Sequence, residues 1–231
     1  MRKLEVPDGY PPEEGCYLRG NDHSPVAVAV ILKWIRDKTP PDIENLVRIG
    51  IESGAALSGT LQTENVGLEK VICNIIANPN IRYLILLGPE SPGHLTGDAI
   101  RALYENGIDE KGKIIGTKAP APFLYNIKKE WIHRFKEQAK LVNLLNEGSP
   151  EIIREAVWAC YQEKPTEFRG YSLYDMGAYP AEPICETITW KIKNPAYTPK
   201  NEKEQMAIEK MRLLVEELRL RNKKKKSNNN S

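Results

Sequence analysis

Histidine and cysteine are scarce in this chain of 231 residues, which contains three of the first and four of the second. No two cysteines form a C-x-x-C pair, so a zinc ribbon or a thioredoxin-like site is disfavoured. Their spacing demands no disulfide, and a reducing cytoplasm is the expected compartment. Cys73 and Cys160 fall within apolar helical patterns and are expected to be core thiols, unlike Cys16 and Cys185. Three scattered histidines also disfavour a three-histidine zinc site.

Long hydrophobic runs and the common cofactor fingerprints are missing as well. The longest apolar run, residues 26–32, is too short to span a bilayer, and the N-terminus lacks the apolar core of a signal peptide. Neither G-x-G-x-x-G nor G-x-x-x-x-G-K-[ST] occurs, which disfavours NAD, FAD or ATP binding of the usual kind. G-x-S-x-G and H-E-x-x-H are also absent. We therefore expect a soluble protein without a transmembrane segment.

Charge is nearly balanced, with 33 Lys and Arg against 31 Asp and Glu and a net charge of +2. This excess is too small to indicate a nucleic-acid-binding domain. Only the C-terminal end is strongly basic, with four consecutive lysines at 223–226. We expect residues 223–231 to form a disordered basic and polar tail. A solubilising role is favoured over contact with nucleic acid or an anionic membrane.

Apolar runs alternate with helical patterns between residues 26 and 162. Strands are predicted at 26–32, 54–59, 81–87, 113–117 and 141–145, and helices at 42–50, 66–76, 98–106, 129–138 and 150–160. The continuous apolar run 26–32 suits a central parallel strand that is buried on both faces. The pattern predicts an α/β fold: a Rossmann-like three-layer domain with a mostly parallel sheet, formed by residues 1–162 after an irregular lead-in.

Residues 163–222 differ in character from the preceding domain. Their first part is rich in Tyr and Pro and is expected to wrap over the domain, with one strand-like piece at 184–192. Residues 201–222 are predicted to form an amphipathic helix with Met206, Met211, Leu214, Val215 and Leu218 as its apolar stripe. This helix would brace the domain or dock a partner, and the brace is favoured.

The glycine-rich segment 88–97, GPESPGHLTG, stands between a predicted strand and a predicted helix. Open parallel sheets build ligand sites at this place, at the carboxyl ends of their strands. Glycines allow a flat ligand to approach the backbone, and a neutral imidazole such as that of His94 can bind a metal. One histidine cannot hold a free metal ion tightly, but it can supply one axial ligand to a metal caged in a macrocycle. Judged from this loop alone, a structural His94 that bonds a neighbouring carbonyl group remains the favoured alternative.

Several motifs change that balance. They are TENVGLEKVI at 63–72, NPNIRY at 78–83, GHLTG at 93–97, ALYENG at 102–107, and Ile115-Gly116 followed by Pro122-Phe123. In order and spacing they resemble the A subunit of the tetrahydromethanopterin S-methyltransferase of methanogenic archaea, over residues 15–162. The resemblance implies a Rossmann-like domain that binds a corrinoid, cobalamin or a related cobamide, with His94 as the axial ligand of cobalt.

The resemblance also implies a reaction. Cobalt would take a methyl group from a methyl-tetrahydropterin and pass it to a thiol, which is coenzyme M in the resembled complex. His94 would bind and release the cobalt in each cycle, and acid should displace it because protonation competes with ligation. The resembled protein ends in a membrane helix, whereas this chain ends in the basic tail, so we expect a soluble homologue that works with methyltransferase partner subunits. The sequence does not indicate the donor, the acceptor, the partners or the oligomeric state.

The residues expected around the cofactor are small, polar, or part of the loops that carry the motifs. They are Gly59, Thr63, Glu64, Asn65, Gly67, Gly88, Gly93, His94, Leu95, Thr96, Gly97, Gly116, Ala119, Pro120, Ala121, Pro122 and Phe123. Four of them, Thr63, Glu64, Asn65 and Thr96, could bond the peripheral amides of a corrin, and the segment 119–122 would offer an apolar rim. No catalytic acid or base is identified, because Glu64 and Glu90 are expected to be solvated loop carboxylates.

Two other functions remain open. The first is an enzyme that binds a pterin or a nucleotide on the same fold and works without cobalt. The second is a cofactor-free homologue with a scaffold or regulatory role. Missing phosphate fingerprints weaken the first, and the intact glycine loops with His94 weaken the second.

Overall fold

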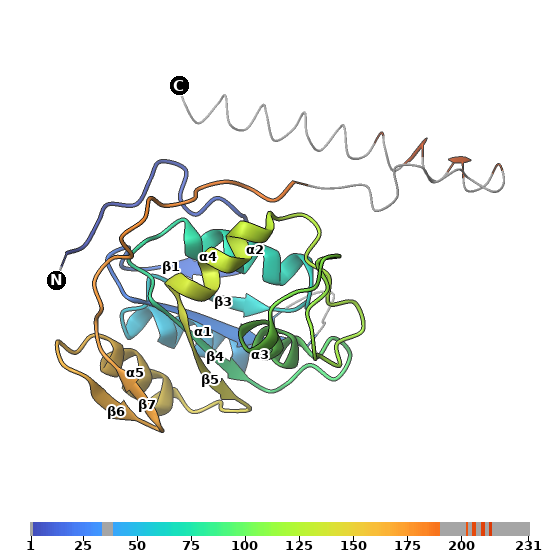
Figure 1. Cartoon of the computed structure of the whole chain (residues 1–231). Helices are drawn as coiled ribbons and strands as arrows, with labels where there is room; N and C mark the ends of the chain where they lie inside the picture. The colour runs from blue at the N-terminus through green and yellow to red at the C-terminus, as the bar shows by residue number, and fades with distance from the viewer. Residues whose placement is uncertain are drawn as a thin grey trace. The chain divides into compact units, whose positions relative to one another are not determined.

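The computed structural model describes residues 2–33 and 39–189, together with Glu202, Gln205, Met206, Glu209, Lys210 and Leu213. The chain divides into two compact units, Met1–Lys191 and Ile192–Ser231. The first unit contains all the strands and helices named below (Figure 1).

A five-stranded sheet forms the centre of the first unit. Its strands are Tyr17–Arg19 (β1), Val26–Ile31 (β2), Leu57–Leu61 (β3), Tyr83–Gly88 (β4) and Lys140–Leu145 (β5), in the order β1-β3-β2-β4-β5. The last four strands are parallel to their neighbours, and β1 is antiparallel to β3. Because β3 and β4 lie on opposite sides of β2, the strand order reverses at β2. Open α/β sheets bind ligands at such a point, outside the carboxyl ends of the strands.

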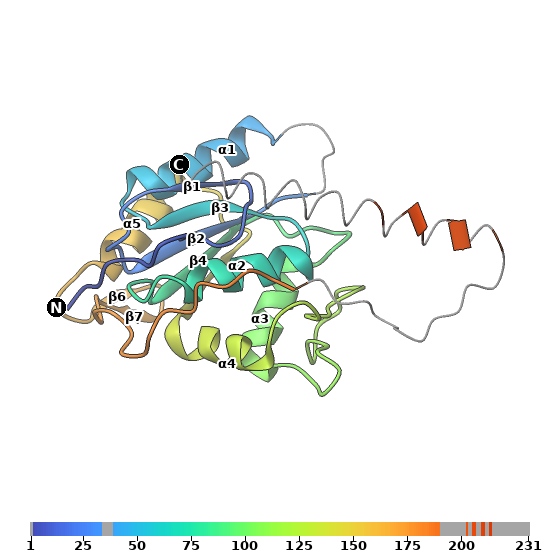
Figure 2. The same cartoon turned by 90° about the horizontal axis from the view of Figure 1, so that it is seen from above.

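Helices cover both faces of the sheet, which confirms the predicted three-layer α/β fold. The helices are Pro41–Glu52 (α1), Val66–Ile76 (α2), Thr96–Asn106 (α3), Lys129–Gln138 (α4) and Pro150–Cys160 (α5). Apolar side chains of α2, α3 and α4 pack on one face with Ala27, Ala29 and Ile31, while those of α1 and α5 pack on the other with Val26, Val28 and Val30. Figure 2 shows α1 and α4 on opposite sides of the sheet. The unbroken apolar run of β2 is thus explained by burial on both faces.

Three strands were not predicted, and the strand predicted at 113–117 is absent. The short strands are β1 and the hairpin of Thr166–Phe168 (β6) and Tyr171–Leu173 (β7), each three residues long and without an apolar run. Residues 113–117 form no strand; two isolated bridges, Ile108 to Ile114 and Lys113 to Phe123, hold this part of the connection between α3 and α4. Ile115 is 46% exposed there. The edge position beside β4 belongs to β5, so this apolar stretch has no strand to pair with.

Residues 174–189 form an extended segment of the first unit after β7. The strand expected at 184–192 is absent from its described part, 184–189, because the backbone there bonds to loops and helix ends instead of to a strand. Residues 190–192 lie outside the described residues, and so does the basic tail 223–231. Of the predicted helix 201–222, the six described residues are helical and exposed. No helix in the described part of the chain has the length and apolar character needed to cross a membrane.

One edge of the sheet is covered by a side chain. The N–H of Lys140 in β5 points toward β4 and donates to the carbonyl oxygen of Arg82. On the opposite side of β5, the N–H of Asn143 donates to the hydroxyl oxygen of Tyr171 at 3.0 Å. The N–H of Leu145 donates to the side-chain oxygen of Asn143 at 3.2 Å. Outward-facing backbone groups of this edge strand are therefore bonded within the chain.

Thiol reactivity should follow burial. Cys73 and Cys160 are buried as predicted, whereas Cys16 is exposed. Burial raises the pKa of the Cys73 thiol to about 12 and also raises the pKa of Cys160. Because the thiolate is the reactive form, iodoacetamide at neutral pH should alkylate Cys16 in the folded protein and leave Cys73 and Cys160 unmodified until denaturant is added. Peptide mass spectrometry would measure this, and equal labelling of Cys73 in the native state would contradict its burial.

Candidate functional site

Three loops meet around one buried carboxylate at the carboxyl edge of the sheet. Glu64 follows β3 and is 1% exposed. Its Oε2 lies 2.7 Å from Nδ1 of His94, in the loop after β4. Its Oε1 accepts a hydrogen bond from the N–H of Ala121 at 3.0 Å, in the connection between α3 and α4. Glu64 therefore joins segments that are 30 and 57 residues away in the sequence.

The imidazole of His94 is oriented by this carboxylate. Metal-binding histidines commonly donate their other ring N–H to a carboxylate, which fixes the ring and makes it a better ligand. Since Nδ1 of His94 is engaged with Glu64, Nε2 is the atom that would reach a metal. The side chain is 33% exposed, while Glu64 is almost fully enclosed. The pair thus consists of a partly exposed imidazole ring bonded to a buried carboxylate.

The loop that carries His94 is held by Glu90. One oxygen of this carboxylate accepts hydrogen bonds from the N–H groups of Ser91 and Gly97, at 2.7 and 3.0 Å, and the other accepts from Asp98 at 2.8 Å. Gly97 and Asp98 belong to the first turn of α3, so Glu90 caps this helix and places a negative charge at its N-terminus. Just before the helix, Leu95 has φ 48° and ψ 47°, a left-handed conformation. The expectation of a solvated carboxylate was therefore wrong for Glu64, which is buried, whereas Glu90 is half-buried and bonds to the backbone.

The connection between α3 and α4 is anchored by two further acidic side chains. Asp98 accepts hydrogen bonds from the Thr117 hydroxyl at 2.7 Å and from the Lys118 N–H at 2.8 Å. Burial alone would raise the pKa of Asp98, but these bonds and Arg101 outweigh it and lower the pKa. Glu69 of α2, which is fully buried, accepts from the N–H and the side-chain amide of Asn126 at 2.7 and 2.8 Å. Together with Glu64, these carboxylates hold a connection that has little regular structure of its own.

Among the predicted site residues, direct hydrogen bonds bring together Glu64, Asn65, His94 and Ala121. Asn65 caps α2 through its side-chain oxygen, which accepts from the Val66 N–H at 2.7 Å, and its amide donates to the Ala121 carbonyl oxygen at 3.3 Å. Two more members, Thr63 and Thr96, bond to nearby backbone: Thr63 accepts from the Gly67 N–H at 2.9 Å, and Thr96 donates to the Gln62 carbonyl oxygen at 3.2 Å.

Several predicted residues have a packing role in the structure. A Cβ atom on Gly59 would lie 2.5 Å from the Cβ of Tyr17 in β1, so this glycine allows β1 and β3 to approach. Gly88 has φ +92° and faces the backbone of Ile31, and Gly116 has φ +83° in a turn beside Asn106. Ala119 and Pro122 are buried, whereas Pro120 and Ala121 are exposed. Phe123 stacks on Tyr125, with ring centroids 5.0 Å apart.

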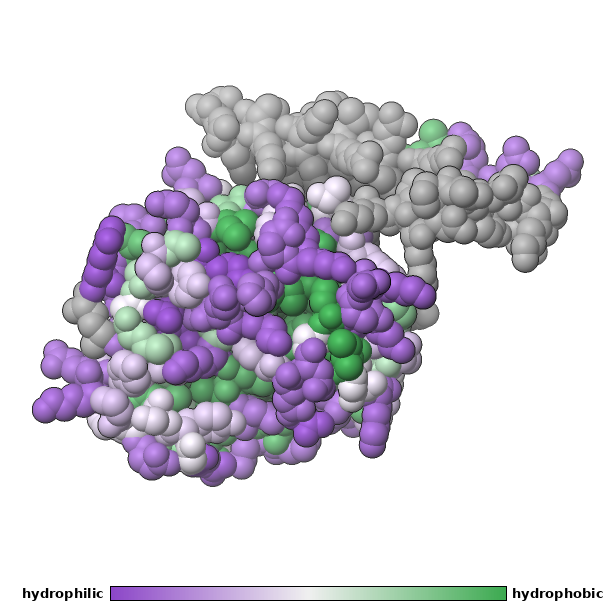
Figure 3. Space-filling view, viewed as in Figure 1, coloured by the Kyte–Doolittle hydropathy of each residue, from purple (hydrophilic) through white to green (hydrophobic). Residues whose placement is uncertain are grey.

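Gly93 differs from these glycines because nothing in the chain requires it. A Cβ atom added there would meet no atom within 4 Å, and its φ lies outside the left-handed region. The residue is exposed and directly precedes His94. Figure 3 shows hydrophobic side chains at the surface on the side where Figure 1 places α3 and the loops beside it. A methyl group at Gly93, directly before His94 in the chain, would therefore stand in open space.

Three contributors were missed in the sequence: Glu69, Asp98 and Asn126. Glu69 and Asp98 lie in the first turns of predicted helices, where acidic residues are common and therefore carry little information. Asn126 stands in an irregular segment and follows no motif. Only the fold brings their partners near them.

No group of three or more His, Cys, Asp or Glu side chains in the described residues could hold a metal ion. His133 is 78% exposed on α4 beside Glu137, as expected for a surface residue, and His23 lies near Glu5. Two hollows, of about 420 and 440 Å³, lie between α1 and α5 and along β5. Neither is lined by a predicted site residue.

Comparisons with known proteins show the family of the chain. The family described as the tetrahydromethanopterin S-methyltransferase A subunit matches residues 3–174, which extends beyond the predicted range 15–162 on both sides. The A 2 subunit of this enzyme from Methanothermobacter thermautotrophicus is 36% identical over 185 residues, which cover 80% of this chain and 89% of the relative. The A 1 subunit from Methanothermobacter marburgensis is 40% identical over 169 residues, 73% of this chain and 66% of the relative. For the A subunit of Methanocaldococcus jannaschii the identity is 40% over 164 residues, 71% of this chain and 64% of the relative.

The match therefore spans about two thirds of the longer relatives and most of the shorter one. The matched region contains β1 to β7 and every residue of the Glu64–His94 site. With a family match over most of its length and relatives near 40% identity, the chain belongs to the family of tetrahydromethanopterin S-methyltransferase A subunits.

Proposed function

We propose that this chain is the corrinoid carrier of a methyltransferase system, with cobalamin or a related cobamide bound at the carboxyl edge of the sheet. His94 would be the axial ligand of cobalt, through Nε2. The observation that carries the proposal is the 2.7 Å hydrogen bond between His94 Nδ1 and the buried carboxylate of Glu64. This pairing gives the imidazole the fixed orientation that a metal ligand needs.

The residues present fit such a group. A corrin supplies the equatorial ligands of its metal, so one protein side chain is sufficient. This agrees with the single histidine, His94, among the predicted site residues. Gly93 leaves open space beside His94 where any side chain would stand. Pro120 and Ala121 are exposed next to Glu64 and offer small apolar contacts. When bound, the cobalt would supply a nucleophile that accepts a methyl group from a methyl-tetrahydropterin and yields it to a thiol such as coenzyme M.

The part of the protein in this reaction is to bind and release. With the ring in the tautomer that carries its proton on Nδ1, Glu64 accepts a hydrogen bond from this N–H, and Nε2 keeps the lone pair that would bind the metal. A proton on Nε2 would use the same lone pair, so protonation and ligation compete. Acid should therefore favour release of His94. Partner subunits would bring the methyl donor and the acceptor, since the relatives are named as subunits of a methyltransferase. We place this reaction in the cytoplasm.

Retention of a corrinoid tests the proposal. The purified full-length chain is mixed with hydroxocobalamin and desalted, and its visible spectrum is compared with that of free hydroxocobalamin. We expect about one equivalent to remain bound, with a spectrum shifted by replacement of the axial ligand. A colourless protein after desalting would contradict the carrier function for this cofactor and favour a cofactor-free scaffold or regulator.

A further inference from the structure

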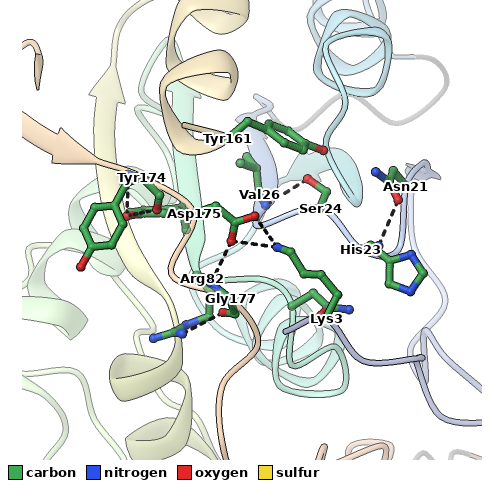
Figure 4. Close-up of polar contacts among 12 residues, drawn as sticks. Lys3, Asn21, His23, Ser24, Val26, Arg82, Tyr161, Tyr174, Asp175 and Gly177 are labelled. Carbon is green, nitrogen blue, oxygen red and sulfur yellow. Dashed lines mark hydrogen bonds and ion pairs between the residues drawn. The ribbon is translucent and has the colours of Figure 1, made fainter. Parts of the chain in front are cut away.

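The extended segment after β7 crosses the domain and ends at the candidate site. We call residues 174–189 the strap. It is fastened first at the amino ends of the strands, where Figure 4 shows Lys3 pairing with Asp175, at 2.6 Å to one carboxylate oxygen. The Tyr83 hydroxyl donates to the Tyr174 carbonyl oxygen at 2.9 Å, and the Arg82 guanidinium donates to that of Gly177 at 3.0 Å. Lys3 and Asp175 are both largely shielded from solvent, so this end is well anchored.

The middle of the strap lies along the helices of one face. The guanidinium groups of Arg82 and Arg134 lie over the ring of Tyr179, at 5.4 and 4.2 Å from its centroid. The Ile184 N–H donates to the carbonyl oxygen of Ile76, the last residue of α2. Figure 2 shows the strap continuing beside α2 toward the other edge of the sheet. Since α2 begins just after β3, this direction leads to the carboxyl ends of the strands.

The far end of the strap is bonded to the connection between α3 and α4. The Ile188 N–H donates to Glu13 at 2.6 Å, and its side chain is buried. The Thr189 N–H donates to the carbonyl oxygen of Asn126 at 2.8 Å. Asn126 is itself fixed on the buried Glu69 by two hydrogen bonds. The strap thus ends on a residue whose backbone and side chain are both held.

Only a short, compact stretch separates Asn126 from the His94 pair. The Phe123 N–H donates to the Ala121 carbonyl oxygen at 2.9 Å, and the rings of Phe123 and Tyr125 stack. Ala121 in turn donates to Oε1 of Glu64, whose other oxygen meets His94. A shift of Asn126 would therefore move Ala121 and break its hydrogen bond to Glu64. With one donor fewer, the Glu64 carboxylate would bond differently to the imidazole.

We propose that the strap sets the His94 site, with Asn126 as the positioning residue through which it acts. The proposal deepens the proposed function in that His94 is taken as the cofactor ligand. The chain continues from Thr189 into the residues for which an amphipathic helix is predicted. A partner protein that holds those residues would act on the last bond of the strap, and so on the strength of the Glu64–His94 bond. Binding of that partner would then change how strongly His94 ligates cobalt, and ligation by His94 would change the affinity for the partner by the same factor.

A pair of substitutions at Thr189 isolates the bond in question. Thr189→Pro removes the N–H that donates to Asn126, whereas Thr189→Ala keeps it. In the full-length chain without cofactor, NMR of ¹⁵N-labelled histidine rings detects the proton on Nδ1 of His94. We expect this hydrogen-bonded signal in the wild type and in Thr189→Ala, and its loss through faster exchange with water in Thr189→Pro. The signals of His23 and His133, which lie outside the path, show whether a change is confined to His94, and far-UV circular dichroism controls for folding.

An unchanged His94 signal in Thr189→Pro would overturn the proposal, and so would an equal loss in both variants, since Thr189→Ala retains the bond. If circular dichroism shows that the proline variant is unfolded, Asn126→Ala tests the second step, from Asn126 to the His94 pair. It removes the side-chain donor to Glu69 and keeps both backbone bonds, and an intact His94 signal in it would overturn the proposal. Because these readings need no corrinoid, they stand apart from hydroxocobalamin retention: a wild type that keeps no cobalamin would refute the carrier function alone.

Discussion

His94→Ala is expected to abolish the spectral shift of bound hydroxocobalamin and to reduce its retention at least tenfold, which corresponds to about 1.4 kcal/mol of lost binding free energy. The substitution removes the atom proposed to reach cobalt. It also leaves Glu64 with one donor fewer, but that carboxylate keeps the Ala121 N–H. The measurement is the visible spectrum and the cobalamin content after desalting.

His133→Ala is the matched control. It removes another imidazole, on α4, whose side chain is 78% exposed and contacts Glu137 rather than the candidate site. Its cobalamin content and spectrum should equal those of the wild type. A His94→Ala variant that keeps the full spectral shift would show that another group, from the protein or the solvent, occupies the axial position.

Gly93→Ala and Gly97→Ala should have opposite effects on stability. A Cβ atom on Gly97 would lie 2.5 Å from Leu145 Cδ1 and 2.8 Å from Glu90 Oε2, the carboxylate that caps α3. The added methyl must displace the ends of these two side chains, and one of them is the carboxylate that caps α3. We therefore expect a cost near the lower end of the ~1–3 kcal/mol range for overpacking, set against the roughly 0.5–1 kcal/mol that alanine gains over glycine within a helix. At Gly93 the added methyl meets nothing within 4 Å, and the more restricted unfolded chain should add about 0.4–1 kcal/mol of stability.

Urea unfolding of the two variants measures this difference, and hydroxocobalamin retention adds a second reading. Gly93→Ala should remain as stable as the wild type or become more stable, yet retain less cobalamin, because its methyl enters the space proposed for the corrin. A Gly93→Ala variant that loses as much stability as Gly97→Ala would contradict the open space at this residue. Undiminished retention would place the cofactor elsewhere.

The parts of the fold that were predicted correctly are those where burial affects a whole segment. β2 and β4 are apolar on both faces because helices cover both, and such runs are visible without knowledge of the partners. The same signal misled at 113–117, where Ile114 is buried but Ile115 is exposed, because pairing with the sheet depends on which edge is vacant. The strands β1, β6 and β7 have three residues each and no pattern long enough to detect.

The candidate site was located by its loop and not by its chemistry. The glycines and the imidazole at 93–97 can be recognised locally, as can the Asn65 cap, since each depends on neighbours in the chain. Glu64 cannot, because it is enclosed only when the connection between α3 and α4 closes over it and Ala121 donates to it. Asn126 and Glu69, separated by 57 residues, meet for the same reason. Burial of a charged group depends on the completed fold, so composition and spacing alone predicted a solvated carboxylate.

The hydrogen bond between Tyr171 and the outer side of β5 bears on the tendency of this protein to aggregate at high concentration. An edge strand with vacant N–H and C=O groups is a template on which a second molecule can add a strand, which leads to aggregation. Here the hydroxyl of Tyr171 occupies the Asn143 N–H, and the Asn143 side chain occupies that of Leu145. Tyr171 of the β6–β7 hairpin thus occupies a backbone group of β5 with which a strand of a second molecule could otherwise pair.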